Sequence, residues 1–142
     1  MTQKLVIDTN VLISAVISQS FPYYIVRSVF LNKNLEWCIS DEIMQEYQDV
    51  LKREKFSKYP GFTLRAETLL ASIDTFAKIF TPEIKLHLIK DEADNKFLEL
   101  AVTCKADYII TGNTNDFTMS SIGKTKIVTP KDYWDILNDT TS

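Results

Sequence analysis

The chain alternates short apolar runs with segments in which apolar residues recur every three or four positions. The short runs are rich in β-branched residues and predict strands, whereas the wider spacing predicts amphipathic helices. Strands are expected at 4–7, 35–39, 77–80, 107–111 and 126–128, and helices at 10–17, 20–31, 41–53, 63–76, 91–104 and 130–137. This alternation indicates an α/β fold in which helices cover both faces of a parallel sheet.

Composition is consistent with one globular domain over residues 1–142, because 45% of the residues are hydrophobic. Sixteen basic residues stand against 19 acidic ones, whereas a protein that binds nucleic acid through its overall charge is usually basic. The chain shows no signal-peptide pattern and no apolar stretch long enough to span a membrane, so we expect a cytoplasmic protein. Cys38 and Cys104 have apolar neighbours and are expected to be buried and free.

Polar residues follow two of the expected strands, at the edge of a parallel sheet where ligands usually bind. Asp8, Thr9 and Asn10 follow the first strand, and Asn113 and Asp116 follow the strand at 107–111. A helix cap would explain Asp8 and a turn would explain the other two. A cap needs only one such residue, however, and the carboxyl ends of parallel strands lie along one edge, so the two loops are expected to approach each other.

Two further acids lie on expected helices. By the rotation of about 100° per residue, Asp94 falls within the apolar stripe formed by Phe97, Leu98, Ala101 and Cys104, where a carboxylate is costly unless it is paired or binds a metal. Glu46 lies at the edge of a similar stripe, a position that is usually only surface. Glu92 and Glu99 are expected to be solvated, and Asp91 to cap its helix.

The acids Asp8, Glu46, Asp94 and Asp116, with Asn113 as a neutral oxygen donor, form a set suited to a hard cation such as Mg²⁺ or Mn²⁺. Such a site can activate water and bind a phosphoryl group. Assigning four acids to it leaves 16 basic residues against 15 acidic ones. The single histidine, His87, lies in a connector and is a poor candidate for a general base.

Four segments carry a resemblance to a known family. VIDTNVLIS, ISDEIMQEYQDVL, DEADNKFLELA and ADYIITGNTNDF resemble, in order, the motifs of PIN-domain ribonucleases, and the similarity runs from about residue 5 to residue 137. The likeness is greatest to the PIN group of toxins from toxin–antitoxin pairs, kin to the VapC toxins. It implies a three-layer α/β/α sandwich, a Rossmann-like PIN domain with a mostly parallel central sheet.

The resemblance also implies a function and its residues. By motif position, Asp8, Glu46, Asp94 and Asp116 match the acidic quartet of a Mg²⁺- or Mn²⁺-dependent endoribonuclease, and Thr9, Asn10 and Thr111 match supporting polar positions. The chain departs from the family at Asn113, where TGN replaces TGD and one metal ligand becomes neutral. A small antitoxin protein is expected as a partner, and a homodimer is allowed.

The densest group of cations lies at 52–58, where Lys52, Arg53, Lys55 and Lys58 are interleaved with Phe56 and Tyr59. Cations with aromatic rings suit single-stranded RNA, through phosphate contacts and base stacking. A solvated helix end explains the same pattern equally well. Lys124, Lys126 and Lys131 form a weaker second group.

The sequence therefore favours a metal-dependent endoribonuclease that acts on single-stranded RNA as the toxin of a toxin–antitoxin pair. The alternative is a PIN-like module that binds RNA or protein without catalysis, for which the departure at Asn113 is the main support. A metal-dependent phosphatase of another α/β family ranks last, because it would favour an acid at Asn10.

Overall fold

The sheet and its helices follow the expected alternation. A computed structural model describes residues 2–89, 92–114, 117 and 119–139. Within these residues the strands are β1 (Gln3–Ile7), β2 (Leu35–Ile39), β3 (Lys78–Ile79), β4 (Tyr108–Ile110), β5 (Ser121–Ile122) and β6 (Thr125–Val128). The helices are α1 (Thr9–Ile17), α2 (Phe21–Leu31), α3 (Asp41–Leu51), the 3₁₀ turn η1 (Glu54–Phe56), α4 (Phe62–Phe76), α5 (Glu92–Cys104) and α6 (Pro130–Asp139).

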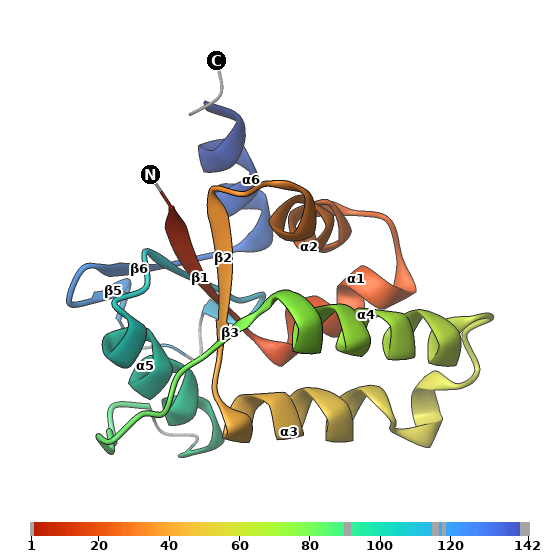
Figure 1. Ribbon diagram of the computed structural model, residues 1–142, viewed down its shortest axis with the longest axis horizontal. Coiled ribbons are helices and arrows are strands. Elements are labelled where there is room, and N and C mark those ends of the chain that lie inside the picture. The colour runs from red at the N-terminus through yellow and green to blue at the C-terminus, as the bar shows by residue number, and fades with distance from the viewer. Residues whose placement is uncertain (1, 90–91, 115–116, 118, 140–142) are drawn as a thin grey trace.

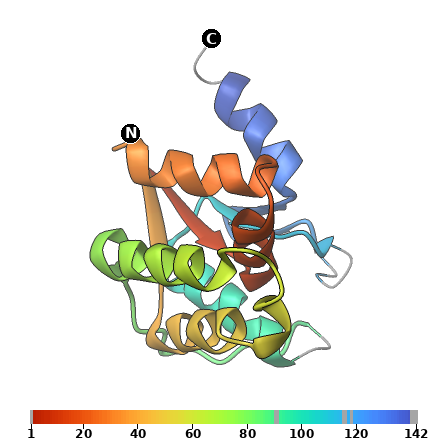
Figure 2. The ribbon, with the colours of Figure 1, turned by 90° about the vertical axis from the view of Figure 1, so that its right-hand side faces the viewer.

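The strands form one sheet in the order β3-β2-β1-β4-β6-β5, and every pair is parallel except β5 with β6. Figure 1 shows α5 on one side of this sheet and α1, α2 and α4 on the other. Turned by 90°, Figure 2 shows α2, α4 and α3 stacked in front of the strands. The fold is therefore the expected α/β sandwich with a mostly parallel central sheet. Helix α3 contacts both α4 and α5, so it links the two helical layers beneath the carboxyl ends of the strands.

Local sequence signals explain where the helices begin. Ser20 occupies the N-cap of α2 with a proline in the first turn, and the Ser40 hydroxyl accepts a 3.2 Å hydrogen bond from the Ile43 amide at the start of α3. Both caps were predicted. The hairpin of β5 and β6 was not, because β5 has only two residues and its turn depends on Gly123 at φ +56°.

The core is continuous from β1 to α5. Leu5, Val6 and Ile7 of β1 are fully buried, as a strand covered on both faces requires. The apolar stripe predicted for α5 is also buried, with Phe97, Leu98 and Ala101 at 0% exposure. Cys38 and Cys104 are buried and free, as predicted. Within the described ranges, no helix is long and apolar enough to cross a membrane.

Candidate functional site

Asp8 lies where β1 ends and α1 begins. Its amide donates a 2.9 Å hydrogen bond to the Ile110 carbonyl, so the backbone continues the sheet pairing, and the residue takes the N-cap position of α1. Its side chain makes no capping hydrogen bond. Instead, Oδ2 accepts a 2.7 Å hydrogen bond from the Thr111 hydroxyl, and both residues are buried. Helix capping therefore does not account for this carboxylate, which is held toward the neighbouring strand β4.

The loops after β1 and β4 meet, as expected of parallel strands whose carboxyl ends share one edge of the sheet. The Gly112 amide donates a 3.3 Å hydrogen bond to Asn10 Oδ1, and the Asn113 amide donates a 3.0 Å hydrogen bond to the Thr111 hydroxyl. Thr111 thus connects Asp8 with the loop after β4, while Asn113 itself is exposed. Asn10 and Thr111 therefore organise the backbone around Asp8, and their role in a reaction stays a prediction.

A second carboxylate lies beside this edge. The Thr9 hydroxyl donates a hydrogen bond to Glu46 Oε2, which brings α3 against the start of α1. The other oxygen of Glu46, Oε1, forms an ion pair of 2.5 Å with Lys96 Nζ on α5. The sequence placed Glu46 at the edge of the apolar stripe of its helix and did not single out Lys96. The sequence carried no clear signal for Lys96, because neighbouring helix positions do not share a face and Lys96 precedes the buried Phe97 directly.

Tyr47 of α3 contacts the last residue of β1, directly before Asp8. Its hydroxyl donates a 2.5 Å hydrogen bond to the Ile7 carbonyl and accepts a 3.4 Å hydrogen bond from the Trp37 indole. Complete burial raises the pKa of Tyr47, and the charges of Asp8 and Glu46 raise it further. The hydroxyl therefore stays protonated and able to donate to the residue that precedes Asp8.

Asp94 lies in the first turn of α5, a helix that packs against β1, β2 and β4. It is half-buried, which agrees with its place near the apolar stripe. Asp116, Asp91 and the side chain of Glu92 lie outside the described residues. Thr9 and Lys96 connect Glu46 to the segments that carry Asp8 and Asp94, and the assembly of the four acids around one cation stays a prediction.

The prediction for Glu99 is wrong, because this side chain is buried rather than solvated. Its Oε2 accepts a 2.9 Å hydrogen bond from the Leu86 amide. Asn95 is buried too, and its Oδ1 accepts hydrogen bonds of 3.0 and 2.9 Å from the Leu88 and Ile89 amides. These two side chains fasten the segment 80–89 to α5, since that segment has no helix or strand to satisfy its backbone.

The donor chemistry around Asp8 and Asp94 fits a hard divalent cation, because the candidates are carboxylate and amide oxygens. The described residues alone do not complete such a site: among them, no group of three His, Cys, Asp or Glu side chains could hold a metal ion. Glu46 is engaged by Thr9 and Lys96, and the assignment of Asp8, Asp94, Asn113 and Asp116 as ligands stays a prediction.

The cations at 52–58 lie at the end of α3 and in the turn after it. Lys52, Arg53, Lys55 and Lys58 are exposed, and Lys52 lies six residues from Glu46, about 9 Å along the helix axis. None of the four forms an ion pair within the described part of the chain. In the second group, by contrast, Lys124 pairs with Asp107 at 3.4 Å and Lys131 with Asp135 at 3.1 Å.

The aromatic rings at 52–58 play a structural part that the sequence did not indicate. Phe56 stacks on Phe62 with ring centroids 5.2 Å apart, and Tyr59 lies 6.4 Å from the same ring. Lys55 Nζ lies 5.1 Å from the centroid of Phe56. Because the rings are half-buried against α4, the exposed lysines and Arg53 are the groups that remain available to a phosphate backbone.

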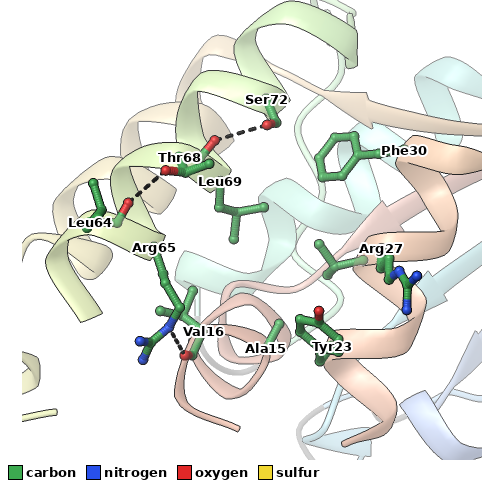
Figure 3. A pocket seen from close by; sticks show the side chains of 11 residues that line it. Ala15, Val16, Tyr23, Arg27, Phe30, Leu64, Arg65, Thr68, Leu69 and Ser72 are labelled. Atoms are coloured by element: carbon green, nitrogen blue, oxygen red, sulfur yellow. Dashed lines mark hydrogen bonds between the residues drawn. The ribbon is translucent and has the colours of Figure 1, made fainter. Parts of the chain in front are cut away.

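An apolar groove of about 430 Å³ lies away from these acids, between α1, α2 and α4 (Figure 3). The Thr68 and Ser72 hydroxyls in its wall donate to carbonyl oxygens of α4 itself, at 2.9 and 3.0 Å. Arg65 Nε donates a 3.0 Å hydrogen bond to the Val16 carbonyl at its margin. Polar groups that could act on a phosphodiester are therefore not gathered in this groove, and the carboxyl edge of the sheet remains the candidate site.

Comparison with known proteins identifies the family of this chain. The sequence pattern of the PIN domain family matches residues 4–115, a range that includes Asp8, Glu46, Asp94 and Asn113 and ends one residue before Asp116. The protein named "Uncharacterized protein MJ1680" from Methanocaldococcus jannaschii is 32% identical over 139 residues, which cover 92% of this chain and 88% of that protein. Neither name refers to a toxin. The family match covers most of the fold and three of the four acids, and the chain belongs to the PIN domain family, whose members are in general nucleases that use divalent metal ions.

Proposed function

We propose that this protein is a Mg²⁺- or Mn²⁺-dependent endoribonuclease that hydrolyses phosphodiester bonds of single-stranded RNA. The observation that supports this most is the buried pair of Thr111 and Asp8 beside the linked side chains of Thr9, Glu46 and Lys96. The carboxyl edge of a parallel sheet is where ligands usually bind. There, the hydrogen bond from Thr111 holds the buried Asp8 carboxylate in one orientation. The family membership supplies the general chemistry of a nuclease.

In this proposal the divalent cation would be held by Asp8, Asp94, Asp116 and Asn113. Glu46 is a further catalytic carboxylate next to these ligands. A bound cation of this kind lowers the pKa of water and withdraws charge from a phosphoryl oxygen. Thr111 holds Asp8 in one orientation, and Thr9 holds Glu46. Tyr47 binds the Ile7 carbonyl and so fixes the end of β1, directly before Asp8 and Thr9. The chain thus supplies an acidic edge whose side chains are already oriented.

The exposed cations at 52–58 support RNA as the substrate. Lys52, Arg53, Lys55 and Lys58 continue from the end of α3, the helix that carries Glu46. A strand whose scissile phosphate lies at the acidic edge would follow α3 toward these side chains, which neutralise phosphates without reading the bases. The affinity for RNA then depends on the salt concentration rather than on the base sequence of the RNA.

We further propose that the nuclease acts in the cytoplasm as the toxin of a toxin–antitoxin pair, neutralised by a small antitoxin protein and able to form a homodimer. The support is the resemblance of the four motifs to that group of PIN domains. The test is production of this chain alone in bacterial cells: arrested growth that is relieved by Asp94→Asn supports the toxin role. Unimpaired growth by cells that contain the folded protein contradicts it.

The nuclease activity is tested by incubating the purified protein with a fluorescently labelled single-stranded RNA in Mn²⁺. Cleavage that stops on addition of a chelator, and that Asp94→Asn abolishes, supports the proposal. Cleavage unaffected by both changes contradicts it. An RNA that binds without being cut, in the presence of Mn²⁺, favours the alternative of a non-catalytic binding module.

A further inference from the structure

Lys96 of α5 forms an ion pair with Glu46 that the sequence did not predict. Its Nζ lies 2.5 Å from Glu46 Oε1, and the side chains of the two residues are 11% and 24% exposed. The family motifs by which the acids were recognised do not assign it a role. A lysine with this little exposure has a cost in solvation that only a close and well-oriented partner offsets.

Each oxygen of the Glu46 carboxylate has a donor. Oε1 faces Lys96 on α5, and Oε2 accepts a hydrogen bond from the Thr9 hydroxyl at the start of α1. Each oxygen therefore has a donor from a different segment, which leaves the carboxylate little freedom to rotate. Thr9 follows Asp8 in the chain, and Lys96 lies two residues after Asp94, so Glu46 is held by neighbours of both acids.

Other ion pairs in the described ranges differ from this one in burial. The lysines of the pairs Lys85–Glu99, Lys124–Asp107 and Lys131–Asp135 have side chains that are 76%, 59% and 66% exposed. Exposed pairs contribute little, because water solvates the two charges nearly as well apart as together. Among these pairs of described residues, Lys96 and Glu46 form the one in which burial makes the orientation of both side chains specific.

We propose that Lys96 is a positioning residue for the nuclease reaction: its ammonium fixes the Glu46 carboxylate beside Asp8 and offsets part of the negative charge at the acidic edge. The inference rests on the proposed function. Lys96 acts through Glu46 in this account, and it makes no contact with the RNA.

Lys96→Met tests the inference, because methionine retains most of the buried aliphatic chain and lacks the charge. The expected result is a fall in kcat of about 10- to 100-fold, the usual effect of removing a group that orients a functional side chain, with KM and the dissociation constant for RNA unchanged. Lys96→Arg restores a positive donor and is expected to recover at least part of kcat. Lys85→Gln, which removes the exposed lysine of another pair, serves as the matched control and keeps the parental rate.

A double-mutant cycle distinguishes a positioning role from a general effect on the fold. If Lys96 acts through Glu46, adding Lys96→Met to Glu46→Gln changes kcat by less than about twofold, since the group to be positioned is already lost. Thermal unfolding of each variant confirms that it is folded. If Lys96→Met does not fold, the same cycle is measured with Lys96→Gln, which also removes the charge.

Three results would overturn the inference. The first is a parental kcat in a folded Lys96→Met protein when the parent protein is active. The second is a loss of kcat in the double variant that equals the product of the two single losses. The third is weaker RNA binding with unchanged kcat, which would make Lys96 a phosphate contact. A folded parent protein that cuts no RNA in Mn²⁺ would instead overturn the proposed function, and this inference with it.

Discussion

Thr111 donates a 2.7 Å hydrogen bond to Asp8, which lies 103 positions earlier in the chain. The two residues meet because β1 and β4 are parallel neighbours in register, with Ile7 beside Ile110. Each follows the last residue of its strand, so the pairing of the strands alone places the donor beside the acceptor. The candidate site is therefore a direct consequence of the strand order.

Replacing Thr111 with Val tests what this hydrogen bond contributes. Thr111 is fully buried and Asp8 is 7% exposed, so the missing donor is poorly replaced by water. We expect a loss of about 1.5–3 kcal/mol in the free energy of unfolding, the usual range for a hydrogen bond to a charged group. Urea denaturation measures it. Thr111→Ser keeps the hydroxyl and should retain most of the stability; equal losses in both variants would show that the methyl group matters instead.

The segment 80–89 should depend on Asn95, which accepts hydrogen bonds from Leu88 and Ile89 and donates one of 3.1 Å back to the Ile89 carbonyl. Asn95→Leu removes all three and is expected to cost about 2 kcal/mol or more. Limited proteolysis should then cut between residues 80 and 89 sooner than in the parent. Glu99→Gln retains an oxygen acceptor for the Leu86 amide and serves as the control. An unchanged cleavage pattern in Asn95→Leu would contradict this role.

Tyr47 predicts a dependence of stability on alkaline pH. Its pKa is raised from an ordinary value of 10.0 in the folded protein, so the unfolded state loses its phenolic proton first as the pH rises. The contribution of Tyr47 is thus complete below pH 10 and declines above it. Tyr47→Phe, which loses the hydrogen bond to Ile7, should be less stable than the parent by about 1 kcal/mol at pH 8.

The same comparison at about pH 11 provides the check. The difference in the free energy of unfolding between the parent protein and Tyr47→Phe should be smaller at this pH. The reason is that only the parent has a tyrosine at position 47 that ionises on unfolding. Urea denaturation at both pH values measures the two differences. A difference that stays constant or widens would mean that Tyr47 does not carry the raised pKa.

The exposed cations after α3 should set RNA affinity rather than the rate of the chemical step. Replacing Lys55 and Lys58 with Gln is expected to weaken RNA binding and to reduce the slope of log affinity against log salt by about 0.7 for each lost phosphate contact. Fluorescence anisotropy at several salt concentrations measures this slope. Lys131→Gln, whose lysine already pairs with Asp135, is the control. An unchanged slope would place the RNA on another surface.

Much of the fold could be predicted from the sequence because its strands are buried and its helices are amphipathic. The run from residue 4 to residue 7 and the stripe of Phe97, Leu98 and Ala101 each have one stable place, which is the core. β5 was not predicted, because its two residues, Ser121 and Ile122, include one apolar residue and do not lie in an apolar run. Its pairing depends on β6 and on the turn at Gly123.

The candidate site was predictable where the acids follow strands and less so where the partners lie on other helices. Asp8 could be singled out because three polar residues follow one strand, and Glu46 only as an edge residue. Lys96 and Glu99 were missed or misjudged, since the position of a residue on its own helix does not reveal which segment covers it. Those partners exist only after α3, α5 and the segment 80–89 have packed together.

The central claim is that the acidic edge around Asp8 cuts RNA, and the most direct test is the rate of Asp8→Asn. Asparagine preserves the shape of the side chain and can still accept the hydrogen bond from Thr111, so the fold should survive while the charge is lost. Cleavage of single-stranded RNA in Mn²⁺ should fall at least about 100-fold relative to the parent, with the thermal unfolding temperature nearly unchanged. A folded Asp8→Asn protein that cuts as fast as the parent would contradict it.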